Sequence, residues 1–329
     1  MFIIRAQAIC IVPCKSLESP RNSLAEVSGR SVDLADDRPI EHLSFTGMDG
    51  TLNRPNALHY APYYVTGVRD RISMIARWIA EYEPDLMVID VSVEVAMLAR
   101  LAATPVVYVR LSGRRDDRAH LDAFRGAEHL LAPWHEDLED VATPDWVRRK
   151  TRYFAPQSNR RPAPCANKVL VVTGRGGAER DGRALAAAAR ATPEWCWVCV
   201  GPVSETSLPP NLIVKGWVGD VAGEIEGCDV VIGGAGDGLI NEVLSSGRPF
   251  ICLPEHRAYG EQVSKAQGLE CAGAAIIRAD WPQAHLWPKL LDQALALSPK
   301  ASDALCGEGL SAAGRWLVDT AKGLRSAVL

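Results

Sequence analysis

Strand-like and helix-like segments alternate along this sequence, and that alternation restricts the fold more than any other feature. In the second half, apolar strand patterns at 168–173, 195–200, 229–233 and 249–254 are interspersed with helix patterns. The first half shows the same order around 84–92. Alternation of this kind predicts an α/β fold, with parallel sheets that helices cover on both faces.

The length and one change in composition predict two domains. The chain has 329 residues, of which 47% are hydrophobic and 23% charged, as in soluble globular proteins. A basic, proline-containing stretch at 146–165 interrupts the periodic pattern, and we expect the domain linker near its end. We therefore expect two Rossmann-like domains, 1–160 and 161–329, facing a cleft. Ligands of such sheets bind beyond the carboxyl ends of the strands.

Charge and cysteine content exclude several classes of protein. A net charge of −4 gives no electrostatic reason to expect a nucleic-acid partner. Nine cysteines, an odd number, fit reduced thiols in a cytoplasm. In "WCWVCV", Cys196 and Cys199 have odd spacing on a strand and should point to opposite faces, which disfavours a metal or redox pair.

No apolar run reaches the ~20 residues of a membrane span. The helix pattern "RDRISMIARWIAEYE" has one apolar face and arginines on the other. Two interpretations stay open for it: packing against the core, or docking on an anionic membrane surface such as the inner membrane.

Two glycine clusters follow strands and precede helices, in "VVTGRGGAE" and "VIGGAGDGLINE". Glycine lets backbone approach a ligand, and a helix N-terminus offers free N–H groups to a diphosphate. The spacing does not fit a dinucleotide fingerprint, because Leu239 takes the place of its last glycine. No Gly-Lys-Ser/Thr follows either cluster, which excludes a P-loop. Tight turns without a ligand remain an alternative.

Two polar residues near the second cluster favour a nucleotide-sugar ligand. Glu242 lies one turn into the helix, where a carboxylate can accept hydrogen bonds from both ribose hydroxyls. Gln262 begins the next helix. The whole stretch "GGAGDGLINEVLSSGRPFICLPEHRAYGEQVSKAQGLECAGAAII" resembles the nucleotide-sugar half of the MurG-like family 28 glycosyltransferases. That bacterial family has the GT-B fold, and the resemblance covers roughly 168–277.

The resemblance implies a role for each matching position. Glu242 would hold the ribose of a UDP-sugar, and Trp217 and Val218 would frame the uracil. The diphosphate would be bound by the backbone of Ala235, Gly236, Asp237 and Gly238. The loop that faces it would consist of Gly174, Arg175, Gly176 and Gly177. The sugar would be lined by Glu255, His256 and Gln262.

The chain departs from the family at two places. Asp237 puts a carboxylate where the family has a small or hydroxyl residue, and we expect it to cap its helix rather than repel a diphosphate. The family's first strand and histidine-bearing glycine loop have no match at the start "MFIIRAQAIC", where "RAQAI" resembles the following helix. Two alternatives stay open: either the true start lies upstream of Met1, or this copy has lost part of its acceptor and catalytic apparatus and with it some or all of its activity.

The resemblance implies transfer of a hexose from a UDP-sugar to an acceptor hydroxyl, with inversion and without a metal or other cofactor. The acceptor class (lipid, glycan or small molecule) stays open. Asp90 and His120 are the candidate bases, with His59 a further one, while "GRRDDRAH" is interpreted as a solvated loop. A nucleotide-sugar hydrolase or epimerase and a noncatalytic binding subunit remain alternatives.

Overall fold

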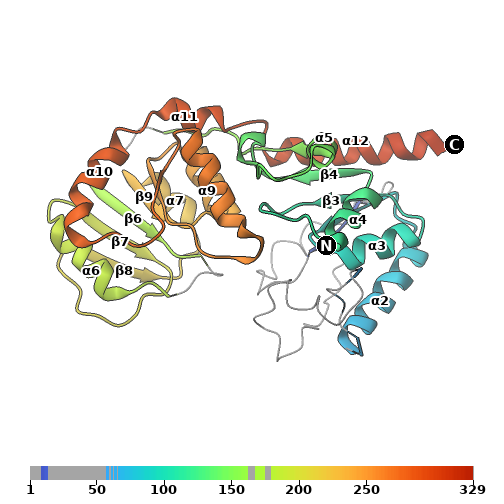
Figure 1. The fold of residues 1–329 in the computed structure, drawn as a ribbon, viewed down its shortest axis with the longest axis horizontal. Coiled ribbons are helices and arrows are strands. Elements are labelled where there is room, and N and C mark those ends of the chain that lie inside the picture. Colours follow the sequence, from blue (N-terminus) through green and yellow to red (C-terminus); the bar gives the residue numbers. More distant parts are fainter. Residues whose placement is uncertain are drawn as a thin grey trace.

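The computed structural model contains two parallel sheets in series (Figure 1), and it describes residues 9–13, 57–58, 61, 63–64, 66–161, 167–174 and 179–328. The first sheet has five strands in the order β1-β2-β3-β4-β5, and the second has six in the order β11-β10-β9-β6-β7-β8. All strand pairings in the described parts of the two sheets are parallel. The predicted α/β architecture is therefore confirmed.

The first sheet alternates its side chains between two layers of helices. Met87 and Ile89 of β2 pack with α2, α3 and α4, whereas Leu86 and Val88 pack with the C-terminal helix α12. The strands are β1 (Ile9–Pro13), β2 (Leu86–Asp90), β3 (Val106–Val109), β4 (His129–Ala132) and β5 (Thr151–Tyr153). The helices are α2 (Thr66–Tyr82), α3 (Val93–Leu101), α4 (Arg118–Gly126), η2 (Glu136–Leu138) and α5 (Asp145–Lys150).

Two sequence interpretations concern this sheet. A strand, β1, pairs with β2 at Ile9–Pro13, where the sequence pattern predicted none. The apolar face of α2 lies in the core, since Ile75 and Ile79 are buried and Trp78 packs against the same cluster. That face is used for packing, so α2 gives no support to membrane docking. Among the helices described, none has both the length and the apolar character of a membrane span.

The second sheet reverses its strand order at β6, which has β9 on one side and β7 on the other. In an open α/β sheet such a switch point opens a crevice at the carboxyl ends of the two neighbouring strands. The strands are β6 (Lys168–Val172), β7 (Cys196–Val200), β8 (Leu212–Gly216), β9 (Val230–Gly233), β10 (Phe250–Cys252) and β11 (Ile276–Ile277). Cys196 and Cys199 of β7 pack into different clusters, on opposite faces as predicted.

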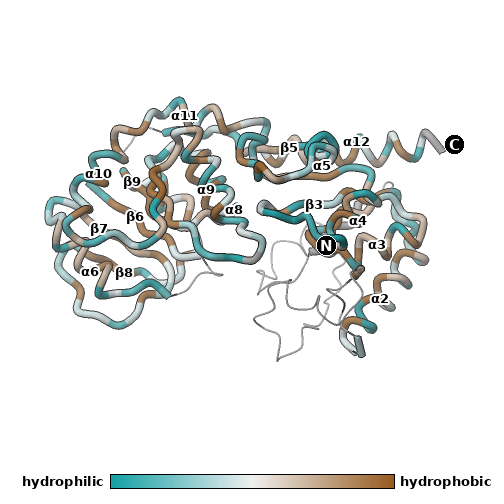
Figure 2. Tube along the Cα trace, in the orientation of Figure 1, coloured by the Kyte–Doolittle hydropathy of each residue, from teal (hydrophilic) through white to brown (hydrophobic). Residues whose placement is uncertain are grey.

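Helices cover both faces of the second sheet, and its apolar strands β6 and β9 form its interior (Figure 2). The last helix then leaves this sheet and packs on the first one, where Arg325 also pairs with Asp85 at 2.6 Å. The helical elements are α6 (Gly182–Ala191), α7 (Val221–Glu226), α8 (Asp237–Ser246), η3 (Ala258–Gly260), α9 (Glu261–Cys271), η4 (Ala284–Leu286), α10 (Trp287–Leu295), α11 (Pro299–Ala304) and α12 (Leu310–Val328).

The segment after β4 crosses into the second domain. Trp134 and Leu138 are almost completely buried, and they belong to the same core cluster as residues of α8 and α9. Gly268 of α9 permits this approach, because a Cβ there would lie 3.0 Å from Leu138 Cα. The two domains therefore share a hydrophobic core at this point.

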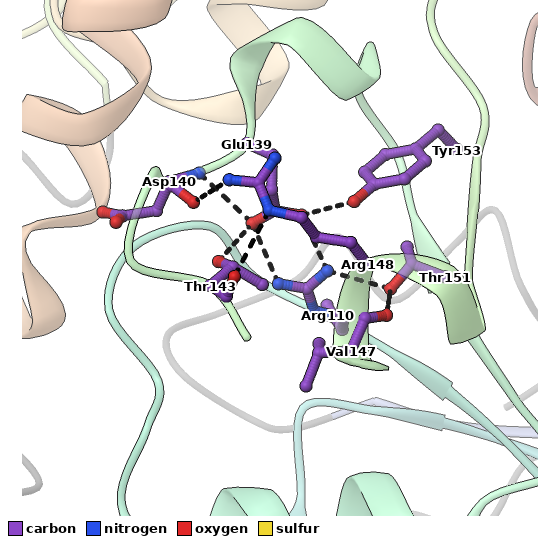
Figure 3. Close-up of polar contacts among 8 residues, drawn as sticks. All are labelled: Arg110, Glu139, Asp140, Thr143, Val147, Arg148, Thr151 and Tyr153. Carbon is purple, nitrogen blue, oxygen red and sulfur yellow. Dashed lines mark hydrogen bonds and ion pairs between the residues drawn. The ribbon is translucent and has the colours of Figure 1, made fainter. Parts of the chain in front are cut away.

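A buried polar network anchors the same segment to the first domain (Figure 3). The Arg110 guanidinium pairs with both carboxylate oxygens of Glu139, at 2.7 and 3.0 Å. Tyr153 and Thr143 also donate to Glu139, each at 2.8 Å. Burial raises the pKa of Glu139, but these hydrogen bonds outweigh it and hold the pKa below its ordinary value.

We predict that Trp134→Ala lowers the free energy of unfolding by about 3–5 kcal/mol, since it leaves a cavity where the two domains meet. Urea denaturation followed by circular dichroism measures this. Leu101→Ala is the control, because Leu101 is 83% exposed, and it should change stability by no more than about 0.5 kcal/mol. Equal effects of the two substitutions would contradict the shared core.

Candidate functional site

The two glycine clusters follow neighbouring strands, β6 and β9, at the switch point of the second sheet. Val172, the last residue of β6, is in register with Gly233, the last residue of β9. The loops that follow these strands therefore leave the sheet at the same edge. In the first loop, Gly174 is exposed with open space around it. The other residues predicted for this facing loop lie outside the described residues, namely Arg175, Gly176 and Gly177.

The four glycines after β9 have two different uses. A Cβ at Gly233 would lie 2.4 Å from the Leu239 side chain, and one at Gly234 would lie 2.9 Å from Gln262 Oε1. A Cβ at Gly236 or Gly238 would meet nothing within 4 Å. The first pair of glycines thus allows close packing of the loop, and the second pair leaves the backbone open to a ligand.

Helix α8 presents an uncapped N-terminus at this edge. Its N-cap is Gly236, which has no side chain to accept from the first-turn N–H groups. The ten-residue helix Asp237–Ser246 points this positive dipole end out of the sheet. Uncapped N–H groups and an open glycine backbone form an environment that suits a diphosphate.

The predicted capping role of Asp237 is wrong. Asp237 is the first residue of α8 and makes an ion pair with Lys265 of α9. The Lys265 side chain is only 2% exposed, and its ammonium lies 4.5 Å from the centre of the Trp134 ring. Burial lowers the pKa of this ammonium, and Glu139 opposes that shift. The pair offsets the Asp237 charge, so the end of α8 can remain attractive to an anion.

The structure also corrects the roles of Ala235 and Gln262. The Ala235 N–H donates to Gln262 Oε1 at 2.9 Å, so it is not directed at a ligand. The same oxygen accepts from the Glu255 N–H at 2.9 Å, and Gln262 is only 8% exposed. Gln262 therefore joins the loop after β9 to the loop after β10 instead of lining the sugar.

The remaining predicted residues surround this edge with different exposures. Glu242 is exposed on α8, and Trp217, which follows β8, is 58% exposed. Val218 is half-buried and packs against the domain core. After β10, Glu255 pairs with Arg257 at 2.6 Å and His256 is exposed.

Asp90 ends β2 of the first domain, at a strained turn. The next residue, Val91, has φ +68°, which a β-branched residue rarely adopts, and the Tyr108 hydroxyl donates to its carbonyl. Burial raises the pKa of the Asp90 carboxyl. Strain and a perturbed carboxyl at a strand end are features that cluster at functional sites.

His120 lies in a different environment from the one predicted. It belongs to the first turn of α4, is 3% exposed, and its Nδ1 lies 2.5 Å from Asp117, the N-cap of that helix. Its Nε2 faces the Arg115 guanidinium at 3.4 Å. Both ring nitrogens are engaged, and Arg115 is buried too. The interpretation of "GRRDDRAH" as a solvated loop is therefore wrong for Arg115 and His120, whereas Arg114 and Asp116 are exposed. His59 lies outside the described residues.

Sequence reasoning missed three buried residues at this edge, namely Trp134, Arg115 and Lys265. Lys265 did carry a signal, because it falls at helical spacing between Gln262, Ala266 and Leu269, all of them buried. A charged residue in a buried stripe predicts a buried partner. Trp134 and Arg115 carried no comparable local signal.

We predict that Asp90→Asn stabilises the protein, and more so as the pH rises. Because burial raises the pKa of Asp90 in the folded state above its ordinary value, the native state binds this proton more tightly than the unfolded state. Native stability is therefore lost as the pH rises from the unfolded-state pKa of Asp90 through its higher folded-state pKa, and asparagine, which does not ionise, removes this loss.

Thermal melts of wild type and Asp90→Asn at pH 4, 6 and 8, values chosen to bracket the ordinary aspartate range, measure the difference in Tm. It should be small at the lowest pH and larger at the highest. Asp280→Asn, at an exposed carboxylate, serves as the control. A Tm difference that does not grow with pH would overturn this account of Asp90.

Comparison with known proteins supports the same view of the fold. Residues 202–303 match the family model described as glycosyltransferase family 28 C-terminal domain. No curated protein sequence matches the chain significantly. MurG of Acinetobacter baumannii is 15% identical, with TM-score 0.55 over 77% of this chain and 78% of that one.

Two further glycosyltransferases are also similar in structure. The calicheamicin glycosyltransferase CalG4 is 16% identical, with TM-score 0.56 over 78% of each chain. Spinosyn rhamnosyltransferase SpnG complexed with thymidine diphosphate is 20% identical, with TM-score 0.53 over 72% of this chain and 71% of that one. Residues 202–303 are thus similar to the glycosyltransferase family 28 C-terminal domains, and the two sheets together have the GT-B fold.

Proposed function

We propose that this protein is a glycosyltransferase that moves a hexose from a UDP-sugar to an acceptor hydroxyl. The observation that carries the proposal is the uncapped N-terminus of α8, open at Gly236 and Gly238 and lying within the family match. The solved neighbour that carries thymidine diphosphate supports a nucleoside diphosphate as the ligand class.

The residues around α8 suit the parts of such a donor. The exposed Glu242 carboxylate, one turn into α8, can accept hydrogen bonds from the ribose hydroxyls. Trp217 is an exposed indole after β8 and can pack on the base together with Val218. Glu255 and His256, after β10, are our candidates for contacts with the sugar.

The chemistry we propose is a single displacement with inversion. The acceptor oxygen attacks the anomeric carbon, its proton passes to a protein base, and the bond to the diphosphate oxygen breaks. The dipole end and free N–H groups of α8 would stabilise the leaving diphosphate, so that the step needs no metal. Lys265 contributes by neutralising Asp237.

Asp90 is the base we favour. His120 has both ring nitrogens engaged, by Asp117 and Arg115, and is almost fully buried. Among the described residues, the Asp90 carboxylate has no hydrogen-bond partner, and its raised pKa makes it a stronger base than an ordinary aspartate. We also place the protein in the cytoplasm, a proposal that the free cysteines of the described chain support.

Glu242→Ala should weaken UDP binding about ten- to a hundredfold, because a hydrogen bond to a charged group contributes about 1.5–3 kcal/mol. Isothermal titration calorimetry with UDP and with 2′-deoxy-UDP measures the effect. The wild type should prefer UDP, and the variant should not distinguish the two. Glu270→Ala, which removes an exposed carboxylate of α9, is the control. An unchanged preference in Glu242→Ala would remove Glu242 from the ribose site.

UDP release tests the reaction itself. We expect the wild type to release UDP from a UDP-hexose only when an acceptor extract is supplied, and Asp90→Asn to slow that release about 10²–10⁴-fold. UDP affinity should stay unchanged in the variant. Release in water alone would instead indicate a hydrolase, and binding without any release would indicate a noncatalytic subunit.

A further inference from the structure

Two loops from different domains contact each other closely beside the proposed donor site. One is residues 112–117, after β3 of the first domain, and the other is residues 254–261, after β10 of the second (Figure 1). The Arg114 N–H donates to the Tyr259 carbonyl at 2.8 Å, and Ser112 Oγ donates to the Glu261 carbonyl at 3.2 Å. Gly113 has φ +87°, and a Cβ there would lie 2.5 Å from the Tyr259 oxygen. Only glycine permits this approach.

Arg115 is the side chain that ties these loops together. Its side chain is 7% exposed, and its Nη2 pairs with Glu261 Oε2 at 3.0 Å. The guanidinium also lies 4.3 Å from the centre of the Tyr259 ring. From the first domain, His120 contacts Arg115 and is itself held by Asp117. A buried arginine with a carboxylate, an aromatic face and a histidine around it has one defined position.

The second loop needs such support, because its own backbone is strained. Tyr259 has φ +61°, unusual for a residue other than glycine, and Gly260 follows with φ +62°. Strained positions persist when surrounding contacts hold them. Here the contacts come from the first domain, through Arg115 and the backbone of Arg114.

The loop also connects directly with the diphosphate edge. Glu261, the partner of Arg115, is adjacent in α9 to Gln262, which binds the backbone N–H groups of Glu255 and Ala235. Glu255 and His256 therefore lie between two fixed points, the Gln262 amide on one side and the Arg115 contact on the other.

We propose that Arg115 is a positioning residue for the sugar part of the donor. Through Glu261 and Tyr259, this residue of the first domain holds the 254–260 loop of the second domain in the shape that directs Glu255 and His256 toward the sugar. The inference rests on the proposed function. It predicts different effects on two parts of donor affinity. The contacts proposed for the nucleotide come from α8 and Trp217, whereas those proposed for the sugar come from the loop that Arg115 supports.

The test compares Arg115→Met with Arg114→Met. The two arginines are neighbours, but Arg114 has a 69% exposed side chain that pairs only with Asp116 among the described residues. Calorimetry with UDP and with UDP-glucose, UDP-galactose and UDP-N-acetylglucosamine gives the ratio of Kd for UDP to Kd for the tightest UDP-sugar. We expect Arg115→Met to reduce this ratio at least fivefold, with Kd for UDP changed less than twofold. Arg114→Met should keep both values, and Arg115→Lys should restore part of the ratio.

Each other result has a defined meaning. An unchanged ratio in folded Arg115→Met overturns the inference, and so does an equal loss of UDP and UDP-sugar affinity, which indicates a structural role alone. If Arg115→Met shows no cooperative melt, the same calorimetry is done with Ser112→Ala, which removes one hydrogen bond to the same loop without leaving a buried charge. An unchanged Kd ratio in Ser112→Ala then overturns the inference. A wild-type protein that binds no UDP refutes the proposed function instead.

Discussion

The buried ion pair between Arg110 and Glu139 is the contact on which the two-domain arrangement depends. Arg110 follows β3 and Glu139 follows η2, so the pair fixes the segment after β4 against the first sheet (Figure 3). Both side chains are at most 2% exposed, and such a pair is stable only when further groups satisfy the carboxylate. Tyr153 and Thr143 do so. Removing one partner would leave a buried charge, at a cost of about 3–5 kcal/mol.

That anchor explains how the second domain tolerates an unusual charge at its ligand edge. The fixed segment places Trp134 and Leu138 in the core of the second domain, and Lys265 packs on the Trp134 ring. Lys265 then interacts electrostatically with Glu139, which raises the pKa of its ammonium, and it forms an ion pair with Asp237. Cations and anions alternate from Arg110 to Asp237. A carboxylate at the first residue of α8 is consequently compatible with diphosphate binding, although its sequence position alone suggests repulsion.

Local patterns predicted what local interactions determine. The strands of the second sheet and the opposite faces of Cys196 and Cys199 follow from periodicity and backbone geometry. The failures have a common cause. Arg115 and Glu261 are 146 residues apart, and Arg110 and Glu139 are 29 apart, so no spacing rule relates them. His120 was a reasonable base by residue type, but its availability depended on Arg115 and Asp117, whose positions only the tertiary structure determines.

The same contacts limit how the proposed donor can enter. Separating the domains would expose Trp134 and Leu138 to water and break the Arg115–Glu261 pair, so it would lose apolar burial and unpair buried charges at once. The open backbone at Gly236 and Gly238 and the exposed Trp217 lie at the sheet edge instead, where no such contact must break. Binding at this edge therefore requires no opening of the shared core. Under the proposed function, the first domain would act on the donor indirectly, by fixing the loops that surround it, and its own strand end at Asp90 would be left for the acceptor.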